Sequence, residues 1–324
     1  MKEEEIRPKG IFDEYLRLAE IDTRLFFSSD RIAVPCPACR EVGKYAFEKN
    51  GFAYDECPQC LTLFVSPRPP AESFARYYRE ADSVKYWAST FYRETAEARR
   101  EKLWRPKAKL VLEALRQVGA AGHSVIDIGG GYGIFAEEYE ALSGGRVIVV
   151  EPGPALAIVC REKGLSVIES FLEDLRRDAL PAGPRAFVSF ELFEHLHDPS
   201  RFLRHLRGLM RSGDVFLFTT LSGTGLDIQV LWDQSKSVSP PHHLNFFNPD
   251  SVRNLLDREA LRVLDISTPG ELDIDILCNN HSLIRDRFWR ALMQRLDDAG
   301  KEKWQSFIAE NGCSSHMMVL CQRP

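Results

Sequence analysis

The sequence predicts an α/β fold with a mainly parallel sheet, preceded by a small cysteine-rich module. Three observations support this. From residue 124 onward, short apolar runs alternate with stretches of helical periodicity, which is the pattern of βαβ units. The first run ends in a glycine-rich turn, VIDIGGGYG. Upstream, two Cys-x-x-Cys pairs lie within residues 36–60.

Composition narrows the class of protein. The chain has 324 residues, 44% of them hydrophobic, which suits one large domain and a small one. A net charge of −5 argues against a general nucleic-acid or anionic-membrane binder. The acidic start, MKEEEIRPKG, predicts no secretory signal, and no apolar run is long enough to span a bilayer. Eight cysteines do not make a disulfide scaffold, so we expect a cytoplasmic protein.

The chain begins with a segment of helical periodicity at residues 11–27. This amphipathic helix could pack on the body of the protein or on a second subunit, which leaves a homo-oligomer open.

The four upstream cysteines have the spacing of a metal site. Seventeen residues separate the two pairs, as in structural zinc sites, and four thiolates complete a closed tetrahedron around Zn²⁺. Asn50-Gly51 between them predicts a hairpin. We therefore expect a zinc ribbon with Cys36, Cys39, Cys57 and Cys60 as ligands.

Three other interpretations of the ribbon are weaker. A redox Cys-x-x-Cys would not need four ligands, and iron is a less common occupant. Nucleic-acid binding is disfavoured because Arg40, Lys44 and Lys49 make only a modest basic surface.

The Pro-rich residues 66–70 predict a connector. Residues 71–104 are expected to be helical and are rich in aromatic residues. Most of these rings should be packing residues, but Tyr77, Tyr78 and Tyr86 could form a lid over the acceptor pocket. A further helix is expected to begin at Pro106 and to end before Gly119.

The glycine-rich turn predicts a ligand site. Gly129, Gly131 and Gly133 carry no side chains, so the backbone can approach a ligand closely. The following helix, 134–142, directs its free N–H groups at the same place. The next strand, 147–150, ends in Glu151, whose carboxylate can accept the hydroxyls of a ribose. A glycine turn without a ligand is the alternative.

The glycine spacing excludes a dinucleotide. A G-x-G-x-x-G fingerprint would need glycine at position 134 or 136, where Ile134 and Ala136 stand. The pattern is instead Asp127-x-Gly129-x-Gly131-x-Gly133. A carboxylate beside the turn opposes a pyrophosphate but suits a ligand with an ammonium and a sulfonium. At these residues the chain resembles the class I S-adenosylmethionine-dependent methyltransferases.

The resemblance implies a seven-stranded Rossmann-like methyltransferase sheet whose last strand, here 315–321, runs antiparallel between strands five and six. It also implies that S-adenosylmethionine contacts Pro152 beside Glu151, and that its adenine contacts residues 169–175. Many relatives carry an Asp at the place of Phe171, so Leu172, Glu173 or a backbone group would serve here. Glu191 lies at the C-terminal end of a strand, where ligands bind in such sheets.

Histidines are the candidates for a general base. His195 belongs to the run EHLHDP, which is similar to the E-H-x-x-D-P run of the family. Residues 221–241 predict a functional loop, which leads to PHHLNFFNP. There His243 matches an H-x-N-x-F run of methyltransferases from cell-surface sugar pathways, in which this loop borders the acceptor. His243, or His242, is therefore our leading base, and a loop-fixing role is the alternative.

We divide the chain into an N-terminal helix (1–30), a zinc ribbon (31–68), a helical lid and linker (69–118) and an S-adenosylmethionine-dependent methyltransferase domain (119–324). The chain is similar to sugar methyltransferases with an N-terminal zinc module, whose C-methylating members carry a further C-terminal domain. We expect O-methylation of a sugar, glycan or other small hydroxylated acceptor. The alternatives are sugar C- or N-methylation, an RNA acceptor, and a cofactor-binding subunit without activity of its own.

Overall fold

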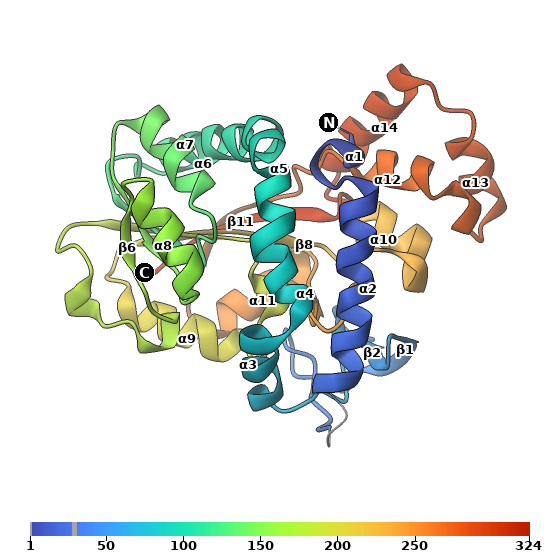
Figure 1. Ribbon diagram of the computed structural model, residues 1–324, viewed down its shortest axis with the longest axis horizontal. Helices are drawn as coiled ribbons and strands as arrows, with labels where there is room; N and C mark the ends of the chain where they lie inside the picture. Colours follow the sequence, from blue (N-terminus) through green and yellow to red (C-terminus); the bar gives the residue numbers. More distant parts are fainter. Residues whose placement is uncertain (1, 28–30) are drawn as a thin grey trace.

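The computed structural model describes residues 2–27 and 31–324 (Figure 1). The predicted boundary at residue 30 lies outside the described residues. In the part of the chain that is described, no helix is long and apolar enough to cross a membrane.

A seven-stranded sheet forms the centre of the molecule, in the order β10-β11-β8-β7-β4-β5-β6. The neighbouring strands from β4 to β8 are parallel. β11 runs antiparallel between β8 and β10, which confirms the predicted fold class. The strands are β4 (Ser124–Ile128), β5 (Val147–Val150), β6 (Ser166–Ile168), β7 (Arg185–Phe190), β8 (Val215–Leu221), β10 (Arg262–Ser267) and β11 (His316–Gln322).

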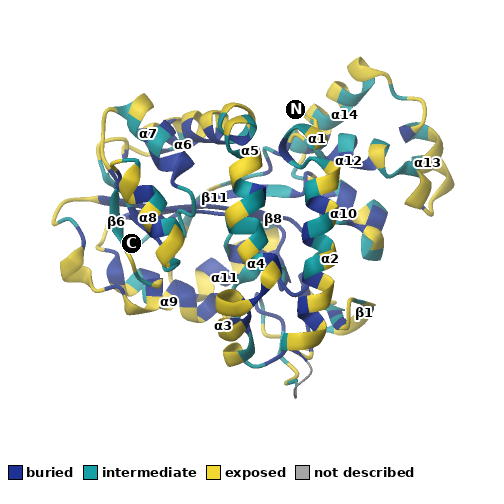
Figure 2. Cartoon of the chain, in the orientation of Figure 1, coloured by how far each residue is buried: buried dark blue, intermediate teal, exposed yellow. Residues whose placement is uncertain are grey.

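Helices cover both faces of this sheet, and every residue of its central strands β7 and β8 is buried (buried residues are dark blue in Figure 2). On one face, Val125, Val149 and Val188 pack against α6 and α7. On the other, Ile126 and Phe187 pack against α9 and α11. Because both faces are buried, the strands read as continuous apolar runs. The helices are α6 (Arg105–Gln117), α7 (Ile134–Ser143), α8 (Pro154–Glu162), α9 (Pro199–Leu209) and α11 (Pro249–Arg258).

A second, four-stranded sheet contains the predicted ribbon, in the order β1-β2-β3-β9. The expected hairpin joins β1 (Lys44–Lys49) to β2 (Phe52–Glu56), and Asn50 and Gly51 both have positive φ. β3 (Leu63–Val65) then pairs with β9 (Asn245–Phe246) from the histidine-containing loop. The ribbon sheet is thus completed by a strand almost 200 residues away in sequence.

The lid and linker segment is helical, as predicted, and α6 begins one residue before Pro106 and ends before Gly119, also as predicted. α3 (Ala71–Glu80) is followed by α4 (Asp82–Tyr86), α5 (Tyr92–Arg99) and α6, joined by π-helical turns at Trp87–Phe91 and Arg100–Trp104. The second π turn ends directly before α6, so the helix continues from one to the other and Pro106 is the second residue of α6. α1 (Glu3–Ile6) and α2 (Lys9–Phe26) lie beside these helices (Figure 1).

Two further helical regions complete the fold. The segment predicted to be an irregular loop, 221–241, contains α10 (Leu226–Leu231). Between β10 and β11 the chain forms the helices α12 (Asp273–Asn279), α13 (Arg287–Met293) and α14 (Asp298–Glu310), which project from the body in Figure 1.

Candidate active site and metal centre

The glycine turn joins β4 to α7 and depends on residues without side chains. Gly129, Gly131 and Gly133 have φ values of 72°, 55° and 70°, a region in which other residues are strained. At Gly130, a Cβ atom would lie 2.7 Å from Val149 Cγ1 and 2.9 Å from Asp127 Oδ2. The turn therefore wraps tightly over Asp127.

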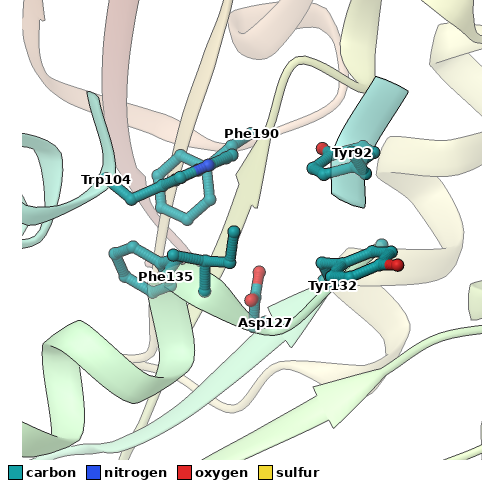
Figure 3. A pocket seen from close by; sticks show the side chains of 9 residues that line it. Tyr92, Trp104, Asp127, Tyr132, Phe135 and Phe190 are labelled. Atoms are coloured by element: carbon teal, nitrogen blue, oxygen red, sulfur yellow. The ribbon is translucent and has the colours of Figure 1, made fainter. Parts of the chain in front are cut away.

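A pocket opens above this turn, and Figure 3 shows its walls. Tyr92 at the start of α5 stacks on Tyr132 of the glycine turn, with ring centroids 5.2 Å apart and 3° between the planes. The opposite wall is aromatic as well, and Asp127 points into the space between the walls. The labelled residues are Tyr92, Trp104, Asp127, Tyr132, Phe135 and Phe190.

Tyr92 and Trp104 supply the aromatic cover of this pocket, although we expected no more than packing from them. They face the pocket where π turns interrupt the regular helix. The candidates for a lid over the acceptor lie elsewhere: Tyr77 and Tyr78 lie against His242, and Tyr86 packs beside the cluster of Phe12, Tyr15 and Phe91. Their role as a lid stays a prediction.

Asp127 carries a carboxylate without a partner. Its exposed fraction is 1%, and neither oxygen accepts a hydrogen bond within the described residues. Burial, and then the nearby charge of Glu151, raise the pKa of Asp127 to about 8. The buried indole Nε1–H of Trp104 also has no acceptor among the described residues. The pocket therefore offers one unused acceptor and one unused donor, both of which a ligand can satisfy.

Glu151 closes the turn from the neighbouring strand. Its Oε2 accepts the Gly131 N–H at 2.9 Å, and its Oε1 accepts the Gly153 N–H at 2.8 Å. Burial raises the pKa of Glu151, and these two hydrogen bonds partly offset that rise. Each carboxylate oxygen can accept more than one hydrogen bond, so hydroxyl groups of a ligand can still bind there.

The remaining predicted cofactor residues lie outside the lining of this pocket. Pro152 is half-buried next to Glu151, the Leu172 side chain is buried in the apolar core, and Glu173 is exposed. Their contacts with a cofactor stay predictions.

Glu191 is held by a network of its own, beside Phe190 of the pocket wall. Its φ is +50°, and its Oε1 accepts from Lys107 Nζ (2.9 Å), Thr219 Oγ1 (2.8 Å) and His316 Nε2 (2.8 Å). Burial opposes ionisation, but Lys107 and His316 hold the pKa of Glu191 well below its usual range. The sequence did not single out Lys107 or His316, which lie 84 and 125 residues from Glu191.

The three candidate histidines converge at the same edge of the sheet. The ring centroid of His195 lies 4.9 Å from that of His243 and 6.0 Å from that of His242. His243 Nδ1 lies 2.6 Å from the Ser237 carbonyl oxygen. Because a carbonyl only accepts, Nδ1 carries the proton and Nε2 keeps its lone pair. Burial, and then the neighbouring His195, lower the pKa of His243 to about 3, so the ring is neutral at pH 7.

His242 and His195 have different surroundings. His242 Nε2 lies 2.6 Å from the hydroxyl of Tyr77, so that nitrogen is already engaged. His195 is neutral as well, because burial lowers its pKa to about 4. Glu194 accepts from Thr220 Oγ1 at 2.8 Å, and burial raises the pKa of Glu194 to about 8. Glu194, His195 and His243 each bring one potential metal-ligand atom within 4.8 Å of the others. The sequence did not reveal this cluster.

The four cysteines predicted to bind metal do come together. Sulfur atoms of Cys36 and Cys60 are 3.5 Å apart, and those of Cys39 and Cys57 are 3.4 Å apart. Zn–S bonds of about 2.3 Å give tetrahedral edges of about 3.8 Å, close to these distances. The two Cys-x-x-Cys pairs form the same kind of turn: the residue that follows each pair, Arg40 or Leu61, has a positive φ. The cluster fits one tetrahedral metal ion.

Comparison with known proteins decides the family. The family described as "Methyltransferase domain" matches residues 96–266, which is more than half of the chain. The chain belongs to this methyltransferase domain family. The match includes the glycine turn, Glu151 and His243, and the domain is of the S-adenosylmethionine-dependent type.

Individual relatives of this methyltransferase domain are distant. The chain is 26% identical over 160 residues to a ubiquinone biosynthesis O-methyltransferase of Xanthomonas euvesicatoria, and the match covers 45% of this chain and 66% of that one. With the enzyme of the same name from Pseudomonas savastanoi, it is 31% identical over 112 residues, which cover 33% of this chain and 47% of that one. The chain thus matches less than two thirds of the length of these relatives.

Among solved structures, one similar chain is the 1,6-didemethyltoxoflavin-N1-methyltransferase of Burkholderia thailandensis, with S-adenosylhomocysteine bound. The TM-score is 0.47 at 13% sequence identity, and the alignment covers 86% of the present chain and 99% of the Burkholderia chain.

The buried carboxylate of Asp127 predicts a pH-dependent stability. Because its pKa in the folded state is raised above the value of about 3.9 in unfolded chains, folding is favoured while it is protonated, and stability falls as pH rises from about 4 through about 8. Without ligand, Asp127→Asn should therefore be as stable as the wild type near pH 4 and more stable at pH 8, by the order of a few kcal/mol. Thermal unfolding at several pH values measures this. A wild-type advantage at pH 8 would contradict the assignment.

Proposed function

We propose that this protein is an O-methyltransferase that moves the methyl group of S-adenosylmethionine to a hydroxyl group of a small acceptor, most simply a sugar or glycan. The observation that carries the proposal is the pocket with an unpartnered Asp127 carboxylate beside the glycine turn. A buried carboxylate without a partner is costly, and a cationic ligand relieves that cost.

The residues present fit this cofactor. Asp127 would accept hydrogen bonds from the ammonium of the methionine part, and the Trp104 indole N–H would donate to its carboxylate. Glu151 would accept the ribose hydroxyls. The aromatic walls also favour a sulfonium, since ring faces attract cations. Pro152, Leu172, Glu173 and Glu191 complete the proposed cofactor contacts.

The chemistry would be a direct displacement. When bound, S-adenosylmethionine supplies a methyl carbon bonded to a positively charged sulfur. The acceptor oxygen forms a bond to that carbon, and the electrons of the broken C–S bond remain on sulfur. His243 Nε2 takes the hydroxyl proton, because its lone pair is free and the ring is neutral. The alignment of acceptor and methyl would give most of the rate gain.

The two other histidines have supporting roles in this proposal. His195, packed against His243, is the second candidate base. His242 is third, because the Tyr77 hydroxyl occupies its Nε2.

Two lines of support bear on the acceptor. The curated relatives are named as O-methyltransferases, which favours an oxygen acceptor. The proposal of a sugar rests on the H-x-N-x-F run at His243 together with the ribbon. Zinc is the proposed ion of the four cysteines, because a closed set of four thiolates is its usual structural site.

The cofactor assignment predicts a specific loss of affinity. Asp127→Asn and Glu151→Gln should each weaken binding of S-adenosylhomocysteine roughly tenfold to a hundredfold, since each removes a charge-assisted hydrogen bond. Isothermal titration calorimetry at pH 8 measures the affinity, and Glu113→Gln on the exposed face of α6 is the matched control. Wild-type affinity in both site variants would refute the assignment.

The base assignment predicts a loss of turnover alone. His243→Ala should lower kcat by about 10²–10⁴-fold and leave the affinity for S-adenosylhomocysteine within twofold. The substrate is the first acceptor found by mass spectrometry of nucleotide sugars, glycans and small phenols incubated with S-adenosylmethionine. His281→Ala serves as the control. Full activity of His243→Ala would eliminate the base, and a rate that requires added Mn²⁺ would assign Glu194, His195 and His243 to metal binding instead.

The metal assignment predicts one zinc ion per chain, measured by inductively coupled plasma mass spectrometry. Cys57→Ser should reduce the zinc content well below one, because three thiolates leave the tetrahedron open. Cys313→Ser, at an exposed cysteine outside the cluster, should keep the full content. Equal zinc in both variants would exclude the site.

A further inference from the structure

We propose that the metal ribbon is a working part of the acceptor site, and that Arg68 is the positioning residue that holds the histidine-bearing turns against it. This inference rests on the proposed function only in giving His195 and His243 a role in the reaction. The structural claim, that Arg68 fixes these imidazoles, can be tested without an acceptor.

Arg68 follows the last ribbon strand and connects three separate segments. Its Nη1 donates to the His197 carbonyl oxygen at 2.5 Å, and its Nη2 donates to Asn245 Oδ1 at 2.9 Å and to the Leu244 carbonyl oxygen at 3.4 Å. Its Nε donates to the Val65 carbonyl oxygen at 3.3 Å. One guanidinium thus binds the ribbon, the turn after His195 and the loop that contains His243.

Arg68 is a buried cation whose hydrogen-bonding groups are satisfied by oxygen atoms of the chain. Its exposed fraction is 3%, and it forms no ion pair within the described residues. A buried cation is costly unless hydrogen bonds satisfy it, and here carbonyl and amide oxygens do so. The planar fork of arginine reaches all three segments at once, which the single ammonium of a lysine cannot do.

A second tie runs from the ribbon to His243 itself. The hydroxyl of Tyr54, a fully buried β2 residue, donates to the His243 carbonyl oxygen at 2.7 Å. Next to it, the Val65 N–H donates to the Leu244 carbonyl oxygen at 2.9 Å, and the Leu244 N–H donates to the Glu194 carbonyl oxygen at 2.8 Å. Ribbon atoms therefore hold the backbone at His243 and Leu244, and Leu244 in turn holds the backbone of Glu194, next to His195.

The metal knuckles hold the far end of the same loop. Asn248 Nδ2 donates to the Cys60 carbonyl oxygen at 2.7 Å. The Arg258 guanidinium of α11 donates to the carbonyl oxygens of Pro37 (2.8 Å) and Ala38, the two residues between the first pair of cysteines. The segment from His243 to Asn248 is therefore tied to the ribbon at one end by Tyr54 and at the other by the Cys60 knuckle.

Arg68→Lys tests the proposal in the full-length, zinc-loaded chain. Long-range ¹H–¹⁵N spectra of the imidazoles at pH 7.5 should show His243 of the wild type as a single tautomer with its proton on Nδ1. In Arg68→Lys, the His243 and His195 signals should move toward tautomer averages, while the affinity for S-adenosylhomocysteine stays within twofold. Arg253→Lys, at an exposed arginine of α11, is the matched control and should leave the spectrum unchanged.

Two further measurements keep the test decisive. Tyr54→Phe removes only one hydroxyl, so it should shift the His243 signals selectively. Removal of zinc with a chelator should reproduce the averaged signals, and added Zn²⁺ should restore them. Unchanged imidazole spectra in Arg68→Lys would overturn the proposal, and so would a loss of S-adenosylhomocysteine affinity parallel to the spectral change, since that would indicate general unfolding. If the wild type did not bind S-adenosylhomocysteine, that result would refute the proposed function but not the role of Arg68.

Discussion

The site is organised around a charge that the fold leaves unsatisfied. Asp127 is the fourth residue of β4, with strands on both sides and the glycine turn folded over it. Its carboxylate is therefore buried, and no donor among residues 2–27 and 31–324 binds it. Such a group lowers the stability of the free protein, because ionisation inside the apolar interior is unfavourable. A fold tolerates this where a ligand provides the missing partner, and functional sites often show strongly shifted pKa values for that reason.

The sheet then determines which other groups can act with Asp127. β4, β5 and β7 are adjacent and parallel, so their C-terminal ends lie along one edge. Asp127, Glu151 and Glu191 all come from these ends, although they are 24 and 40 residues apart in sequence. This is the edge at which open α/β sheets bind their ligands. The strand order alone therefore places these three carboxylates along one edge of the sheet.

The parts of the structure predicted from sequence are those encoded by short-range patterns. The glycine spacing, the acidic residue after β5 and the cysteine pairs are each contained in a few residues, because the turn or knuckle itself demands them. The alternation of elements predicts the βαβ units and their parallel sheet, whereas the seven strands and the inserted last strand are what the resemblance to the methyltransferase family implies. Asp127 was therefore identifiable, and so were the four cysteines.

The features that were missed depend on contacts between distant segments. Tyr92 and Trp104 face the pocket only because π turns change the phase of a long helix, and no simple 3.6-residue periodicity contains that information. β9 has two residues, which is too short to show an alternation, and it exists because β3 offers it a partner. Lys107, His316 and Arg68 act across 84 to 177 residues, so single-sequence patterns give no signal for them.

The three histidines are surrounded by residues from two different parts of the chain. Residues 96–266, which match the family, contain the glycine turn and the three histidines, but much of the surface around those histidines comes from outside that segment. Tyr15 of α2 lies with its ring 5.5 Å from that of His242, Tyr77 of α3 bonds to the same histidine, and Tyr54 of the ribbon holds His243. The surroundings of the histidines are therefore built in part by N-terminal elements outside the family match, through contacts between segments far apart in sequence.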